Sequence, residues 1–246
     1  MERSSGKEKK LIFDEENHKY YVGNEEYISV TTLIHSYFNK FDMQEVSKRY
    51  AEKNGLDQDE VIEMWKKNGE RASEFGNKIH FWGEELLKGK EVRIPEEDPI
   101  DDYDRKAPKY LKIMKKYIEQ RFKEKYELID VEKRVFSEEY KVAGTIDILA
   151  KDKKTGEIVI MDWKTNKSLK FENRFQRGKG PLYKMDDCNY NHYRLQLNIY
   201  KEILKNYYQG ENFQMKIVHI MEDSIKTYNV KELPEAKEIL KRGKNG

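Results

Sequence analysis

The pattern of apolar and polar positions predicts alternating strands and helices over the second half of the chain. The predicted strands are short apolar runs at about 127–136, 142–151, 158–164 and 213–221. Helical periodicity occupies the segments between and around them, at about 105–126, 190–208 and 234–242. This order predicts an α/β fold with a central mixed β-sheet flanked by helices.

The first hundred residues predict smaller elements. Residues 1–10 form a basic lead that we expect to be disordered, and residues 11–30 predict a β-hairpin that turns near Gly23. A helical pattern at about 59–89 and an acidic, proline-containing loop at 91–104 follow. We therefore expect three parts: the lead (1–10), an N-terminal hairpin and helical extension (11–58) and the core (59–246).

Composition narrows the class of protein. Of the 246 residues 38% are charged and 37% hydrophobic, yet 17 Tyr, 10 Phe and 3 Trp suffice for a core. The net charge is only +2, so a nucleic-acid-binding surface has to be local. A single cysteine, Cys188, excludes a disulfide framework, a zinc ribbon and a four-cysteine iron–sulfur cluster. Without an apolar membrane span or signal-peptide core, we expect a soluble, cytoplasmic protein with no membrane contact.

Three charged residues interrupt the apolar strands at 142–151 and 158–164. If the turn between them is Lys153–Gly156, Asp147 lies opposite Asp162, with facing Cβ atoms roughly 5 Å apart. Lys164 shares a face with Asp162 because strand residues two apart point the same way. Facing carboxylates repel unless a cation lies between them, and hard oxygen ligands suit magnesium or manganese. A lysine beside that metal could activate water or stabilise developing charge.

The D-x-K triplet alone is weak support, because such triplets are common surface turns in so charged a chain. The preceding "GTID" strand, at the spacing that makes the carboxylates face, strengthens it. Four motifs then follow in order: Gly76 with His80, "GTID" at 144–147, "DWKT" at 162–165 and "QLNIY" at 196–200. Together they resemble the motif series of the PD-(D/E)XK nucleases over about residues 65–205. The match is nearest to the RecB-like branch, which includes phage exonucleases and the mitochondrial genome-maintenance exonuclease.

This resemblance implies a role for each matching position. His80, Asp147, Asp162 and the Trp163 carbonyl would bind one or two Mg²⁺ or Mn²⁺ ions, and the imidazole favours manganese. Lys164 would be the catalytic lysine. Without the other motifs, a core or surface histidine is the simpler interpretation of His80. The chain departs from the iron–sulfur branch of the family, since one cysteine cannot hold that cluster.

Two further matches complete the implied site. Glu132 matches the acid on the strand before the hairpin, although Glu127, Asp130 and Glu138 lie in the same stretch. Gln196 and Tyr200, one helical turn apart, match a Q-x-x-x-Y motif that steadies the site and contacts DNA. Ordinary packing is the alternative role for Tyr200.

A basic, aromatic-containing loop at about 166–188 directly follows the Lys164 strand. Lysines and arginines interleaved with Phe171, Phe175 and Tyr183 are typical of single-strand binding, although a solvated loop with no partner is the alternative. The predicted DNA contacts are Lys167, Arg174, Arg177, Lys179 and Arg194, with Arg71 and Lys78 on the His80 helix.

The sequence therefore predicts a metal-dependent DNA nuclease, an exonuclease acting on single strands or duplex ends. The resemblance implies 5′-phosphate and 3′-hydroxyl products, and a phage or viral setting fits it. A structure-selective or nicking endonuclease on the same core is the alternative among enzymes. A DNA-binding protein without turnover is the alternative outside them.

Overall fold

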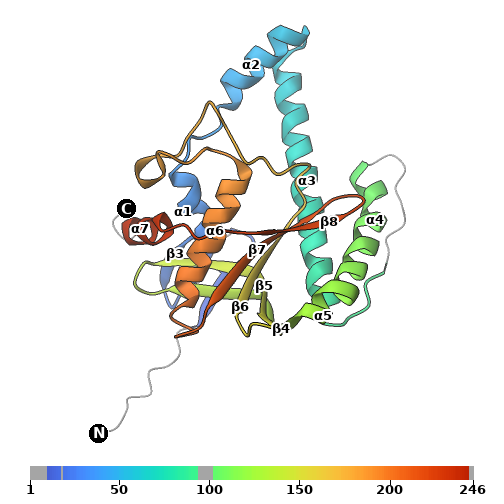
Figure 1. Cartoon of the computed structure of the whole chain (residues 1–246). Helices are drawn as coiled ribbons and strands as arrows, with labels where there is room; N and C mark the ends of the chain where they lie inside the picture. The colour runs from blue at the N-terminus through green and yellow to red at the C-terminus, as the bar shows by residue number, and fades with distance from the viewer. Residues whose placement is uncertain (1–9, 18, 94–101, 244–246) are drawn as a thin grey trace.

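The structure is a computed structural model and describes residues 10–17, 19–93 and 102–243. Nearly all of the predicted basic lead and most of the predicted acidic loop lie outside these ranges. The described residues form a mixed sheet with helices on both faces, so the predicted α/β class is confirmed (Figure 1).

The central sheet contains eight strands among the described residues. In spatial order, seven of them are β1 (Leu11–Asp14), β2 (Lys19–Val22), β3 (Glu25–Ser29), β5 (Val142–Asp152), β6 (Ile158–Lys164), β7 (Phe213–Ile220) and β8 (Ile225–Asn229). The eighth, β4 (Tyr126–Ser137), pairs with β5. The β3–β5 and β6–β7 pairs are parallel, and the other pairs are antiparallel.

Alternating side chains of the central strands divide the core into two layers. Ile158 and Ile160 of β6 pack in a cluster with α1 (Val30–Ser36), α6 (Asn189–Leu204) and α7 (Glu235–Gly243). The intervening Val159, Met161 and Trp163 pack instead with α3 (Gln58–Leu87) and α4 (Asp102–Tyr117). A π-helical turn, Ile118–Phe122, and a short α5, Lys123–Lys125, lead from α4 into β4. Strands buried on both faces explain the nearly continuous apolar runs.

The N-terminal segment forms three strands, where a single hairpin was predicted. The β2–β3 turn contains Gly23 in a left-handed conformation (φ 63°), as expected. A second turn precedes it, between β1 and β2. Asp14 accepts hydrogen bonds from both the backbone and the side chain of Asn17 there, and these bonds stabilise the reversal that pairs β2 with β1. Helix α2 (Met43–Asn54) and the start of α3 project away from the sheet (Figure 1).

Candidate active site

The predicted register of the β5–β6 hairpin is correct. The Asp152 N–H donates to the Glu157 carbonyl at 2.9 Å, and the ladder runs up to the Ile148–Met161 pair. One residue further along this register, Asp147 lies opposite Asp162. There the ladder ends, and the Asp147 carboxylate accepts the Trp163 backbone N–H at 2.8 Å. The Asp147 side chain thus replaces the backbone acceptor that a continued ladder would offer to Trp163, at the position where Asp147 and Asp162 face one another.

Glu132 extends this row of acids onto a third strand. The β4–β5 register pairs Val131 with Ile148 and Lys133 with Ile146, which places Glu132 opposite Asp147. Glu132 has a φ of 48°, a left-handed conformation that is uncommon for a non-glycine residue and typical of functional sites. Burial, and then the nearby Asp147 charge, raise the pKa of Glu132 to about 7.

Helix α3 supplies the histidine. Its buried residues Phe75, Ile79 and Trp82 fix the helix against the sheet, and His80 Nδ1 lies 3.3 Å from Asp147 Oδ2. Gly83 permits this close packing, since a Cβ there would lie 2.7 Å from Trp163 Nε1. Ligand atoms of His80, Glu132 and Asp147 all lie within 4.8 Å of one another.

This donor set suits a divalent cation. One imidazole and two carboxylates are oxygen and nitrogen ligands of the kind that magnesium and, more readily, manganese accept. A cation among them would also relieve the repulsion between Glu132 and Asp147 that helps to raise the Glu132 pKa. The residues therefore fit the predicted metal, and Glu132, which was predicted as an acid of the site and not as a ligand, is a candidate to hold it. Ligation by Asp162 and by the Trp163 carbonyl remains a prediction.

Asp162 and Lys164 form a buried ion pair beside the acids. Lys164 Nζ lies 2.5 Å from Asp162 Oδ2, and only 15% and 4% of the two side chains are exposed. Burial raises the pKa of Asp162 to about 6. Burial opposes charge on Lys164, but Asp162 and Asp147 outweigh it and raise the lysine pKa. The lysine is therefore held as a cation next to the proposed metal ligands.

Helix α6 packs Gln196, Tyr200 and Tyr193 against this region. The Gln196 amide donates to the Tyr200 hydroxyl at 3.5 Å, and Tyr200 is buried against Gly144. A Cβ at position 144 would lie 2.7 Å from the Tyr200 ring, which explains the glycine of "GTID". Lys164 Nζ lies 4.6 Å from the Tyr193 ring centroid, a cation–π contact. The predicted motif residues thus support the strand that carries Asp147.

A pocket of about 380 Å³ opens beside the cluster. Its lining combines the sheet, α3 and the N-terminal strand: Phe13, Glu15, Asn77, His80, Phe81, Glu84, Glu132, Arg134 and Thr145. Five of these residues were not predicted from the sequence: Phe13, Glu15, Asn77, Phe81 and Arg134. Helical spacing from His80 and strand spacing from Glu132 would have indicated Asn77 and Arg134, because both positions share a face with a predicted site residue.

The loop between β6 and α6 carries the predicted basic and aromatic residues. Phe175 is 95% exposed and Tyr183 60% exposed, whereas the half-exposed Phe171 packs against Tyr190, with tilted rings whose centroids lie 4.6 Å apart. Lys167 and Arg174 are exposed, and Arg177 lies 3.6 Å from Asp186. The loop therefore presents aromatic and cationic groups to solvent together.

Four other predicted contacts are engaged within the protein. Arg71 and Lys78 both form ion pairs with Asp104 of α4, at 3.3 and 2.9 Å. Lys179 donates to the Phe38 carbonyl at 3.2 Å. The Arg194 guanidinium donates to the carbonyls of residues 231 and 232. DNA contact by these four residues stays a prediction. To make it, each side chain has to leave its partner within the protein or bind a phosphate while keeping that partner.

The sequence model of the PD-(D/E)XK nuclease superfamily matches residues 25–243. No curated protein matches the chain. The crystal structure of SSO0001 is similar over 92% of this chain and 76% of its own, at 17% identity and a TM-score of 0.38. A protein from Eubacterium rectale, provisionally named an exonuclease, is similar over 89% of this chain and 82% of its own, at 14% identity and a TM-score of 0.42. Within the described ranges, no helix has the length and apolarity needed to cross a membrane.

Proposed function

Because the chain belongs to the PD-(D/E)XK nuclease superfamily, we propose that it is a metal-dependent deoxyribonuclease that hydrolyses phosphodiester bonds. One observation carries the proposal: the ligand atoms of His80, Glu132 and Asp147 lie within 4.8 Å of one another, and the Asp162–Lys164 ion pair occupies the adjacent strand. Four charged side chains from three strands are thus gathered around one histidine, and the single backbone hydrogen bond to Asp147 does not account for the other three.

His80, Glu132 and Asp147 would hold Mg²⁺ or Mn²⁺, with Asp162 and the Trp163 carbonyl as further ligands. The bound ion supplies Lewis-acid polarisation of the phosphate and a more acidic water. We expect manganese to support activity at least as well as magnesium, because imidazole is a better ligand for manganese.

The protein's own residues orient the reactants. Lys164, held as a cation by Asp162 and Asp147, would donate hydrogen bonds to the attacking water or to the phosphate oxygens as negative charge develops. The Trp163 N–H fixes the orientation of the Asp147 carboxylate. Glu132 keeps a left-handed backbone conformation, which persists only where the surrounding structure fixes it, so little reordering would accompany ligand binding.

We further propose exonuclease action and membership of the RecB-like branch, on the motif series and on the loop that follows β6. A loop with exposed Phe175 and Tyr183 among cations suits a single strand, since bases stack on aromatic rings and phosphates pair with cations. The expected products are a 5′-phosphate and a 3′-hydroxyl.

The test is hydrolysis of matched DNA substrates by the purified chain with Mg²⁺ or Mn²⁺. Linear single strands and linear duplexes should be degraded progressively from an end, whereas covalently closed circles should remain intact. Cleavage of closed circles would identify an endonuclease instead. If the chain retains DNA at low salt and releases no products with either metal, it is a DNA-binding protein and the proposed activity is refuted.

A further inference from the structure

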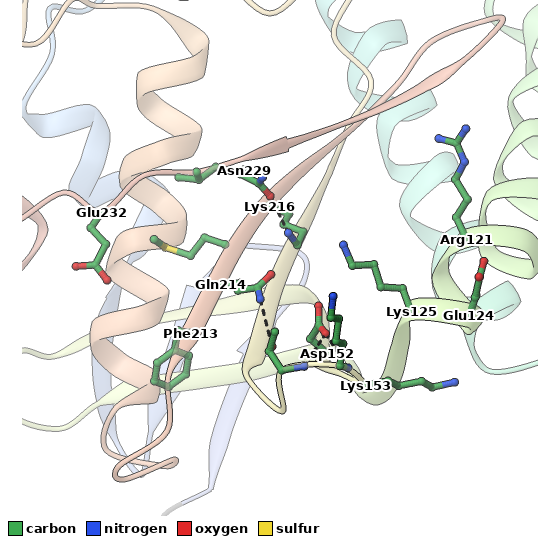
Figure 2. A pocket seen from close by; sticks show the side chains of 14 residues that line it. Arg121, Glu124, Lys125, Asp152, Lys153, Phe213, Gln214, Lys216, Asn229 and Glu232 are labelled. Atoms are coloured by element: carbon green, nitrogen blue, oxygen red, sulfur yellow. Dashed lines mark hydrogen bonds between the residues drawn. The ribbon is translucent and has the colours of Figure 1, made fainter.

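A second and larger pocket lies at the tip of the β5–β6 hairpin, whereas Asp147 and Asp162 lie where that hairpin opens. Its volume is about 910 Å³, the size of a small-molecule site. Five basic residues line it: Arg121, Lys125, Lys153, Lys154 and Lys216. They come from the π-helical turn, α5, the hairpin tip and β7 (Figure 2). Segments far apart in the sequence therefore combine to make one cationic pocket.

Lys216 is the unusual member of this pocket. It is only 5% exposed, and within the described part of the chain its ammonium donates one hydrogen bond, to Asn229 Oδ1 at 2.7 Å. An ammonium carries three N–H donors, and a buried charge without sufficient partners is costly. The Lys216 side chain thus has donors left for a ligand.

Lys125 places a second ammonium group near Lys216, and two such charges favour a bound anion. Figure 2 shows the Lys125 and Lys216 side chains pointing toward one another across the pocket. Burial and then the Lys125 charge lower the pKa of Lys216, while Asp152 and Glu157 act in the opposite direction. Two facing cations repel, as two facing carboxylates do, until an ion of opposite charge lies between them.

The acidic residues of the pocket neutralise it only in part. Asp152 Oδ1 accepts the backbone N–H groups of Lys154 and Thr155, and Glu232 forms an ion pair with Lys201 at 2.5 Å. Glu124 also lines the pocket. Five cations thus face three carboxylates, of which Asp152 is engaged by backbone N–H groups and Glu232 by Lys201, and this balance favours an anionic ligand.

We propose that this pocket binds the terminal phosphate of a nucleotide-sized ligand, a nucleoside monophosphate, with Lys216 and Lys125 as the phosphate ligands. Lysine ammonium groups bind phosphate through charge-assisted hydrogen bonds. The pocket volume exceeds that needed for phosphate alone, and Phe213 adds an aromatic side chain to its wall for a base. This site is separate from the nuclease centre and does not depend on its activity.

The test is calorimetric titration of the full chain with deoxyadenosine monophosphate, inorganic phosphate and deoxyadenosine. An Asp147→Asn background in EDTA removes metal-dependent binding at the nuclease centre. We expect saturable binding of the monophosphate, weaker binding of phosphate and none of deoxyadenosine. Lys216→Met should weaken monophosphate binding about 10-fold or more, as expected for a lost charged hydrogen bond. The exposed Lys125→Met should weaken it several-fold, and Lys237→Met on α7 should leave it unchanged.

Three results would overturn the proposal, the third of them from a parallel titration with a short DNA duplex. Unchanged monophosphate affinity in both Lys216→Met and Lys125→Met places the ligand elsewhere. Equal affinity for phosphate and monophosphate would show that the pocket binds a free phosphate ion only. A Lys216-dependent affinity for duplex DNA alone would show that it binds a phosphate of the DNA backbone. Because Lys125 is exposed, its variant tests the pocket even if replacement of Lys216 impairs folding.

Discussion

The Asp147 carboxylate accepts the backbone N–H of Trp163 at 2.8 Å, and this bond joins β5 to β6 just beyond the end of their ladder. The same carboxylate lies 3.3 Å from His80 Nδ1. Burial opposes its ionisation, but His80 and Lys164 outweigh burial and hold the pKa of Asp147 below its usual value. Asp147 therefore links the helix, the hairpin and the charge of the site.

Replacement of Asp147 by Asn should separate structure from chemistry. The amide oxygen can still accept the Trp163 N–H, so the fold should be kept, while loss of the charge that His80 and Lys164 stabilise should lower the thermal midpoint modestly. The lost negative charge should reduce Mn²⁺ affinity and hydrolysis by about 100-fold or more, beyond the 10–100-fold typical of residues that only support a ligand. Calorimetric Mn²⁺ titration and a cleavage assay measure the two effects, with the exposed Asp59→Asn as control. Wild-type Mn²⁺ affinity in Asp147→Asn would exclude Asp147 as a ligand.

Lys164→Met should affect turnover more than metal binding. Lys164 contacts Asp162, while the ligand atoms that lie within 4.8 Å of one another belong to other residues. We expect the cleavage rate to fall about 10²–10³-fold, the usual loss for one group that stabilises transition-state charge. Mn²⁺ affinity should stay within about 10-fold of wild type. Lys53→Ala on α2 is the control, and a Lys164→Met variant that cleaves at the wild-type rate would refute the catalytic assignment.

Glu132→Gln should stabilise the metal-free protein at high pH. The native pKa of about 7 exceeds the unperturbed 4.5, so the native state binds more protons between these values. Wild-type unfolding free energy should therefore decline as pH rises from about 4.5 to 7, and the Gln variant should lack this decline. Urea unfolding in EDTA should show the variant more stable by about 1–2 kcal/mol at pH 8 and equal near pH 4.

Bound metal should make wild type more stable than Glu132→Gln at pH 8, the reverse of the order expected in EDTA. A ligand that binds only the native state stabilises it by mass action, so Mn²⁺ should stabilise wild type more than Glu132→Gln. Glu127→Gln, on the same strand but exposed, is the control for both measurements. A Gln variant that gains as much stability from Mn²⁺ as wild type would remove Glu132 from the ligand set.

The strand ladder was predictable from sequence because local turn chemistry fixes its register. Asp152 and Gly156 define the turn, Gly156 has a φ of 75°, and every pair toward Ile148 follows by counting. The left-handed Glu132 was not predictable, since no local residue preference calls for it. Its conformation is set by the surrounding strands and site, where local rules are expected to fail.

The partners of charged side chains could not be predicted from the sequence either. Nothing in the pattern indicates that Asp104 of α4 would pair with both Arg71 and Lys78, because that contact depends on how α3 packs against α4. The Lys216 pocket was missed for a similar reason. Its cations come from three separated stretches of the chain, 121–125, 153–154 and 216, and only the fold brings them together.

Gly144→Ala should destabilise the protein through a single contact. The added Cβ would lie 2.7 Å from the buried Tyr200 ring, closer than real contacts allow, so ring or strand has to move. Overpacking of this kind costs about 1–3 kcal/mol, which urea unfolding can measure. The double variant Gly144→Ala, Tyr200→Ala tests the cause, because its loss should be smaller than the sum of the two single losses. Additive losses would place the strain elsewhere.

Phe175→Ala should weaken binding of single-stranded DNA without affecting the fold. Phe175 is 95% exposed, so its removal leaves no cavity, and base stacking on one aromatic side chain contributes about 1–3 kcal/mol. We expect about 5- to 100-fold weaker binding of an oligothymidine in EDTA, measured by fluorescence anisotropy. Because the phosphate contacts remain, the slope of log affinity against log salt should stay the same, whereas Arg174→Ala should reduce it. Leu56→Ala, an exposed apolar residue near α2, is the matched control, and equal losses in the two variants would assign the effect to general surface hydrophobicity instead of the loop.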